Sequence, residues 1–193
     1  DTKNLPLNEV LMIPDKLSGK GEPSLIRAKM LNCKPIVEQH LRNVKIAFIV
    51  GSLAGANGSS LIQFLANVAE EQGVFTIGFT LMPRKSEKTR HFRAGASLRR
   101  LKNQINSLVV VDVDSIFERS RDRPIIEAYE TTNKLISLSI EKLLSASDDQ
   151  HYPSGLGNLL NSFKKGGYSM LSLGRSSSPE GIEDAIIEAV HSL

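Results

Sequence analysis

Apolar residues along the chain follow two patterns that alternate with one another. Short continuous apolar runs are typical of strands buried on both faces, whereas the segments between them carry apolar residues at helical spacing. This alternation predicts an α/β protein with a Rossmann-like, doubly wound parallel sheet. The expected strands are residues 9–13, 44–50, 74–82, 107–113 and 168–173, and the expected helices are residues 23–41, 61–72, 86–104, 124–146, 158–165 and 182–190.

Individual side chains add detail to two of these helices. Cys33 lies on the apolar stripe of the first helix, so we expect a small core residue rather than a nucleophile. Pro35 falls inside the same helix and should kink it. The helix at 86–104 is expected to bury Phe92, Ala96, Leu98 and Leu101.

A loop of small residues follows the strand at 44–50. Residues 51–60 read G-S-L-A-G-A-N-G-S-S, and the helical pattern begins at Leu61. A strand, a small-residue loop and a helix together direct backbone N–H groups and a helix N-terminus at an anion. The loop is therefore a candidate phosphate site, and an ordinary turn between strand and helix is the alternative.

Two further polar segments also follow strand ends. Residues 83–90 come after the strand at 74–82, and Asp112 and Asp114 come at the end of the strand at 107–113. The carboxyl ends of parallel strands share one edge of the sheet, where ligands bind in such folds. We expect these segments and the loop at 51–60 to converge there.

Composition narrows the class of protein. The chain has 193 residues, 40% of them apolar, which is enough for a hydrophobic core. Its single cysteine excludes an internal disulfide and indicates a reducing compartment. No apolar run reaches membrane-spanning length, no signal peptide is visible, and the four histidines lack metal-ligand spacing. We expect a cytoplasmic protein without a zinc site.

Basic residues crowd the segment 84–102, although the formal net charge is only +3. Such a segment is either an electrostatic footprint for nucleic acid or an acidic partner, or a solvated helix face. Only Phe92 interleaves with the charges to stack on bases, so no direct nucleic-acid contact is expected. The basic residues are Arg84, Lys85, Lys88, Arg90, Arg93, Arg99, Arg100 and Lys102.

The small-residue loop resembles the FtsZ/tubulin superfamily of GTP-binding, filament-forming proteins. That family carries G-G-G-T-G-T/S-G between a strand and a helix. The order of the surrounding segments also fits the family over nearly the whole chain. The matching residues here are Ala54, Gly55, Ala56, Asn57, Gly58, Ser59 and Ser60.

Other segments resemble parts of the family's nucleotide site. Gly19 and Gly21 lie in a G-K-G-E-P turn like the one that faces the terminal phosphate. Glu87 and Arg90 resemble a Glu…Arg pair near the ribose and phosphates, one residue closer together here. The resemblance implies that these four residues contact the nucleotide.

Tyr129 and Asn133 are four residues apart, so they share one face of the long helix. They resemble the family's aromatic-plus-amide pair, which stacks on guanine and hydrogen-bonds its edge. The resemblance therefore implies GTP or GDP as the ligand, with Mg²⁺ as a possible companion. It also implies head-to-tail filaments of this protein or of related FtsZ-like subunits, serving cell division or cell shape.

The loop after the long helix departs from the family pattern N-x-D-x-x-D/E. Gly155 and Asn158 stand where the family has two carboxylates that help water attack the terminal phosphate. A glycine cannot polarise water, and a neutral amide is a poor base. Asp148 and Asp149 lie upstream as possible substitutes. We expect weak or absent GTP hydrolysis and assign no catalytic residue.

The resemblance also divides the chain. Residues 1–123 are the expected nucleotide-binding domain without its first strand and glycine-rich loop, 124–146 a connecting helix, 147–157 a linker, and 158–193 the start of a second α/β domain. Within that last part, residues 167–171 resemble the strand that opens the second domain. The chain is thus expected to be incomplete, and membrane contact is expected only through an adaptor or a missing tail.

Rival functions stay open at this point. The first is a non-polymerising, non-catalytic scaffold or regulatory protein that keeps the fold. A dinucleotide-dependent oxidoreductase is disfavoured because G-x-G-x-x-G spacing is missing. Nucleic-acid binding through residues 84–102 would show a steep salt dependence.

Overall fold

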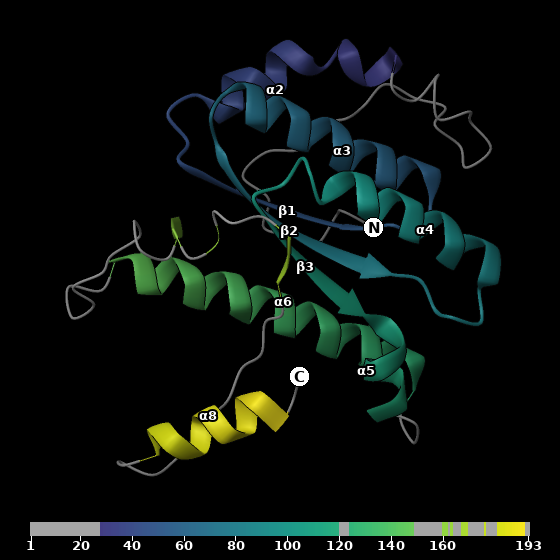
Figure 1. Cartoon of the computed structure of the whole chain (residues 1–193), viewed down its shortest axis with the longest axis vertical. Helices are drawn as coiled ribbons and strands as arrows, with labels where there is room; N and C mark the ends of the chain where they lie inside the picture. The colour runs from purple at the N-terminus through teal and green to yellow at the C-terminus, as the bar shows by residue number, and fades with distance from the viewer. Residues whose placement is uncertain are drawn as a thin grey trace.

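The structure, a computed structural model, describes residues 28–119, 124–148, 160–161, 163, 167–169, 176 and 181–191. Helices and strands alternate through these ranges, as the apolar pattern predicts (Figure 1). In order they are α2 Lys34–Leu41, β1 Ile46–Ser52, α3 Ala56–Glu71, β2 Phe75–Met82, α4 Lys88–Leu101, β3 Ser107–Asp112, α5 Val113–Arg119, α6 Ile125–Asp148, β4 Tyr168–Ser169 and α8 Ile182–His191.

The strands form one parallel sheet in the order β1-β2-β3-β4. Phe79 at its centre pairs with Val50 on one side and Val109 on the other. The predicted Rossmann-like sheet is therefore confirmed. β4 pairs with β3 and extends this sheet, whereas the expected division into domains stays a prediction. The expected strand at 9–13 lies outside the described residues.

Helices cover both faces of the sheet. Figure 1 shows α3 and α4 on one face and α6 on the other. Complete burial of an Ile, Leu, Val or Phe side chain stabilises the fold by roughly 1.5–3 kcal/mol. One core joins α3 and α4 to the sheet through Ile49, Ile62, Ala66, Leu101 and Leu108, and the other joins α6 to it through Ile77, Phe79, Val109 and Ile136.

Helix α3 starts earlier than its apolar pattern indicates. It begins at Ala56, five residues before Leu61, so residues 56–60 form helical turns rather than a loop. Gly55 caps the helix in an extended conformation, and the Ser59 hydroxyl donates to the Gly55 carbonyl oxygen at 3.0 Å. Small polar residues carry no apolar periodicity, which is why the pattern missed these turns.

The expected apolar face of the helix at 86–104 is wrong at Phe92. The Phe92 side chain is 75% exposed, whereas Ala94 and Leu101 are buried. Leu98 packs on the same core, so the buried positions follow i, i+4 and i+7 spacing from Ala94. Phe92 lies about 200° around the helix from Ala94, and both cannot face the sheet.

The first helix also departs from expectation, while the prediction for Cys33 is confirmed. Cys33 is buried, but the helix breaks at residues 32–33 and α2 begins at Lys34. Pro35 thus lies in the first turn of a new helix, where its missing N–H costs little, instead of kinking a continuous one. None of the helices in the described ranges has the length and apolar character needed to cross a membrane.

Candidate functional site

The end of β1 leads directly into the N-terminus of α3. Leu53 is buried and donates its N–H to the carbonyl oxygen of Leu81 at 3.0 Å, which ties this junction to the end of β2. Ala54 donates its N–H to the Ser52 hydroxyl at 3.2 Å. The N-cap of α3 is Gly55, which has no side chain to cap the first turn, and the positive end of the helix dipole at this position favours an anion.

The two glycines of this junction have different surroundings. A Cβ on Gly55 would meet no described atom within 4 Å. A Cβ on Gly58 would collide with the carbonyl oxygen of Ser52. Gly58 therefore serves the packing of α3 on the end of β1, whereas Gly55 leaves room for a ligand.

The remaining residues of the predicted phosphate loop divide by exposure. Asn57 and Ser59 are partly exposed near the start of α3. Ser60 is buried, with only 7% of its surface exposed. Ala56 is the first residue of the helix. The most accessible candidates for a phosphate contact are thus the backbone at the start of α3 and the Ser59 hydroxyl.

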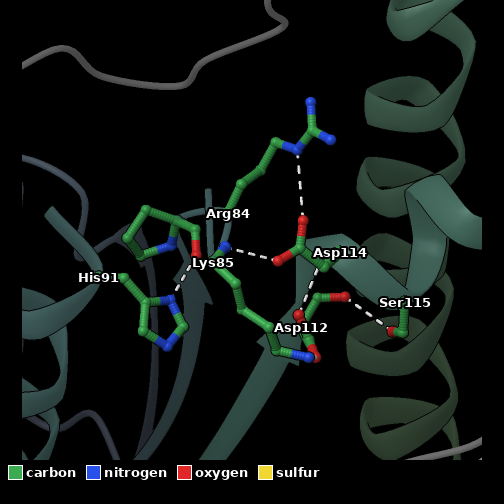
Figure 2. A network of polar contacts seen from close by, with 7 residues as sticks. Arg84, Lys85, His91, Asp112, Asp114 and Ser115 are labelled. Atoms are coloured by element: carbon green, nitrogen blue, oxygen red, sulfur yellow. Dashed lines mark hydrogen bonds and ion pairs between the residues drawn. The ribbon is translucent and has the colours of Figure 1, made fainter. Parts of the chain in front are cut away.

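A network of charged groups joins the ends of β2 and β3 (Figure 2). Arg84 donates from Nε to Asp114 Oδ1 at 3.2 Å, and Lys85 donates its backbone N–H to Asp114 Oδ2 at 2.5 Å. Lys85 Nζ also lies 3.6 Å from Asp112 Oδ2. The expected convergence of residues 83–90 with Asp112 and Asp114 is therefore confirmed.

The electrostatics of this network favour an ionised Asp114. The backbone N–H of Lys85 is the largest influence that holds the pKa of Asp114 below its ordinary value, followed by the guanidinium of Arg84, while desolvation opposes both. Asp112 accepts the Asp114 N–H at 3.0 Å and, through its carbonyl, the Ser115 hydroxyl at 2.8 Å. These bonds fix the turn from β3 into α5.

His91 belongs to the same edge of the sheet. Its Nδ1 lies 2.9 Å from the Pro83 carbonyl oxygen. Figure 2 shows His91 close to Lys85. A carbonyl oxygen only accepts, so the Nδ1 nitrogen carries the proton. The histidine thereby anchors α4 to the end of β2.

Glu87 and Arg90 lie at the start of α4 and bind each other. Arg90 Nη1 donates to Glu87 Oε2 at 2.7 Å. This hydrogen bond is the largest cause of the lowered pKa of Glu87. Both side chains reach solvent. The Glu87 N–H donates to the carbonyl oxygen of Arg84 at 2.9 Å, which connects the pair to the contact between Arg84 and Asp114.

Tyr129 and Asn133 lie on an exposed face of α6, with 43% of Tyr129 exposed. The Tyr129 ring forms an edge-to-face pair with Phe117 of α5, with 5.4 Å between ring centroids and an interplanar angle of 82°. Arg84 Cζ lies 4.8 Å from the centroid of Phe117. The expected base-stacking residue is thus linked to the ends of β2 and β3. Gly19, Gly21, Asp149, Gly155 and Asn158 lie outside the described residues.

The apolar pattern does not predict the helix at residues 113–119, and Phe117 is therefore not among the site residues expected from the sequence. The only local signal was the Ile116-Phe117 pair between polar residues. The sequence shows that Arg84 and Lys85 are basic, but it does not show that Asp114 is their partner. Their pairing joins residues 29 and 30 positions apart, which no local pattern can reveal.

Comparison with known proteins decides the family. Residues 15–121 match the family described as "Tubulin/FtsZ family, GTPase domain". The chain belongs to the tubulin/FtsZ family. It is similar to "Cell division protein FtsZ 1" of Halobacterium salinarum, with 24% identity over 95% of this chain and 48% of the relative. It is also similar to "Cell division protein FtsZ 2" of Methanocaldococcus jannaschii, with 22% identity over 65% of this chain and 33% of the relative.

Solved structures of tubulin/FtsZ proteins share the fold. An FtsZ dimer of M. jannaschii superimposes with a TM-score of 0.78 and 21% identity over 89% of this chain and 51% of that one. A CetZ from Methanosaeta thermophila gives 0.73 and 19%, over 93% and 52%. This chain therefore spans about half the length of those proteins, and the likeness supports the Rossmann-like α/β fold.

Proposed function

We propose that this tubulin/FtsZ family chain binds GTP and GDP at the carboxyl edge of its sheet. The observation that carries the proposal is the N-terminus of α3 at the end of β1, where the N-cap is Gly55 and a Cβ on that residue would meet no described atom within 4 Å. Backbone N–H groups there suit phosphate oxygens, because small residues permit close approach and the helix dipole favours negative charge. The family match supports the choice of a guanine nucleotide.

The predicted site residues take separate roles in this proposal. Residues 55–60 hold phosphate through their backbone and hydroxyl groups, and Glu87 with Arg90 lies toward the ribose and phosphates. Tyr129 stacks on guanine, and Asn133 hydrogen-bonds the base edge. Gly19 and Gly21 would face the terminal phosphate.

Mg²⁺ would accompany the triphosphate and neutralise part of its charge. Within the described ranges, no three His, Cys, Asp or Glu side chains lie close enough to hold a metal ion by themselves. An ion there would therefore depend on phosphate oxygens and water for most of its ligands, as Mg²⁺ commonly does.

Self-association in the cytoplasm is the second part of the proposal. One solved structure similar to this chain is an FtsZ dimer, and another is a protofilament of TubZ from Bacillus thuringiensis. A head-to-tail contact of this chain with itself or with a related FtsZ-like subunit is heterologous, and such a contact builds an open filament when its rotation does not close a ring. Cell division or cell shape is the proposed task. Hydrolysis should be weak, because Gly155 and Asn158 replace the expected carboxylates.

Nucleotide titration tests the binding proposal. We expect a fluorescent GDP analogue to bind and to be displaced by GTP and GDP but not by ATP. Tyr129→Ala should weaken binding by about 5- to 150-fold, the equivalent of about 1–3 kcal/mol for one base–aromatic stack. Tyr168→Ala is the matched control, because Tyr168 is similarly exposed, at 49%, on another element.

Different outcomes separate the candidate functions. If the complete protein binds no guanine nucleotide, the result favours a scaffold that keeps the fold. Binding with GTP-dependent light scattering supports the filament, and binding without it supports a regulatory subunit. Phosphate release at the rate of ordinary family members, retained when Asp148 and Asp149 are replaced, would contradict the expectation of weak hydrolysis.

A further inference from the structure

We propose that Phe117 is a positioning residue that holds the ring of Tyr129 ready to stack on the nucleotide base. The inference rests on the proposed function, because it assigns Tyr129 to the base. It adds a residue from α5, outside the predicted site. The contacts run in sequence from Asp114 through Arg84 and Phe117 to Tyr129.

The first contact orients Arg84. Its Nε–H donates to Asp114 Oδ1 at 3.2 Å, and Asp114 is itself held by the backbone N–H of Lys85. A guanidinium is planar and rigid, so fixing one of its N–H groups restricts the direction of the whole plane. Asp114 follows β3 and Arg84 follows β2, and the guanidinium is therefore anchored to the ends of two adjacent strands.

The second contact orients Phe117. Arg84 Cζ lies 4.8 Å from the centroid of the Phe117 ring, within the range of a cation–π interaction. Phe117 is partly buried, and its helix α5 packs against α6 (Figure 1). One face of the ring is thereby occupied by a cation whose own position is fixed.

The third contact restrains Tyr129. Its ring lies 5.4 Å from that of Phe117 at 82°, and an edge-to-face pair leaves at least one face of Tyr129 clear of Phe117. Tyr129 remains 43% exposed, so a base can reach it. A tyrosine on an exposed helix face samples several rotamers, and selecting one before binding removes an entropic cost of association.

A double-mutant cycle tests the inference in the intact chain. We expect Phe117→Leu to weaken GDP binding by about 2- to 10-fold, the range expected for an aromatic pair, and Phe117→Tyr to preserve binding. In a Tyr129→Ala background Phe117→Leu should have no further effect, because its action passes through Tyr129. Phe92→Leu is the matched control, since Phe92 is an exposed phenylalanine on α4.

Fluorescence anisotropy without nucleotide measures the mobility of the Tyr129 ring directly. The chain has no tryptophan and three tyrosines, so Tyr152→Phe and Tyr168→Phe leave Tyr129 as the only strong intrinsic fluorophore. We expect Phe117→Leu to lower the fluorescence anisotropy of Tyr129, and Phe92→Leu to leave it unchanged.

The outcomes distinguish this inference from the proposed function. If the unaltered chain binds no guanine nucleotide, the proposed function fails and the inference fails with it. If the unaltered chain binds GDP and Phe117→Leu binds equally well, the inference alone is overturned. An equal loss of affinity with and without Tyr129 would also overturn it, because the role of Phe117 would then be structural.

Discussion

Gly58 in the first turns of α3 lies directly against the carbonyl oxygen of Ser52 at the end of β1. A side chain at position 58 would occupy the place of that oxygen. The glycine therefore lets the helix approach the strand, and the close approach sets the position of the helix N-terminus. A Cβ on Gly55, three residues earlier, would meet no described atom within 4 Å. Gly58 is therefore required for packing of the helix on the strand, whereas Gly55 is not.

Gly58→Ala should lower the stability of the fold. The added methyl group meets backbone, so we expect an overpacking cost near 3 kcal/mol, which exceeds the gain of about 1 kcal/mol in helix propensity. The net loss of about 2 kcal/mol corresponds to a fall in Tm of roughly 4–8 °C. Thermal and urea unfolding measure it.

Gly55→Ala is the matched control for that prediction. The weaker cap and the reduced entropy of the unfolded chain are each worth about 0.5 kcal/mol and have opposite signs. We expect stability to stay within about 0.5 kcal/mol and nucleotide affinity to fall. Equal stability losses for the two variants would show that Gly58 is not a packing glycine.

Asp114→Asn should destabilise the edge that joins β2 and β3. The variant loses the ion pair with Arg84 and weakens the bond from the Lys85 N–H. Charge-assisted hydrogen bonds near solvent are screened, and we therefore expect a loss of about 1 kcal/mol at pH 7. Urea unfolding at low and high salt gives the value, and no loss at low salt would contradict the prediction.

The effect of Asp114 should depend on pH. Its pKa is lowered on folding from an ordinary value of 3.8, so the unfolded chain takes up the proton first as pH falls. The contribution of Asp114 is complete above that value and is lost as pH drops through the folded pKa. The difference in free energy of unfolding between the unaltered chain and Asp114→Asn should close below about pH 4. A difference that stays constant to lower pH would exclude this carboxylate as the cause.

Glu87 and Arg90 should matter more for binding than for stability. Their ion pair is exposed, and such pairs contribute too little to be resolved by denaturation. We expect Arg90→Gln to leave Tm unchanged and to weaken GDP binding. Lys88→Gln is the control, because it removes an exposed charge from the same turn. Equal affinities for both variants and the unaltered chain would remove the pair from the proposed site.

Two side-chain truncations test which face of α4 is buried. Leu101 is fully buried, and Leu101→Ala should cost about 2–5 kcal/mol. Phe92 is 75% exposed, and Phe92→Ala should change the free energy of unfolding by no more than about 0.5 kcal/mol. A large loss of stability for Phe92→Ala would contradict this orientation of α4 and would support the apolar face expected from the sequence.

The sequence by itself determined the alternation of strands and helices and the edge of the sheet that carries the polar groups. Runs such as residues 74–82 are mostly apolar and lack strict alternation because both faces of a parallel strand are covered, and this signal is local. Parallel strands then require their carboxyl ends to meet, so the approach of residues 83–90 to Asp112 and Asp114 followed from topology alone.

Tertiary structure decided what depends on distant partners. Close packing against the core buries Ala94 on α4 and leaves Phe92 exposed. The apolar pattern alone does not distinguish these two positions, and Phe92 is the larger apolar side chain. The start of α3 depends on the contact between Gly58 and Ser52, and the surroundings of Tyr129 depend on Phe117 and Arg84. Hydrophobic periodicity reports burial along one element. The contact between side chains from different elements is fixed only when the elements pack, because it depends on their relative position and rotation.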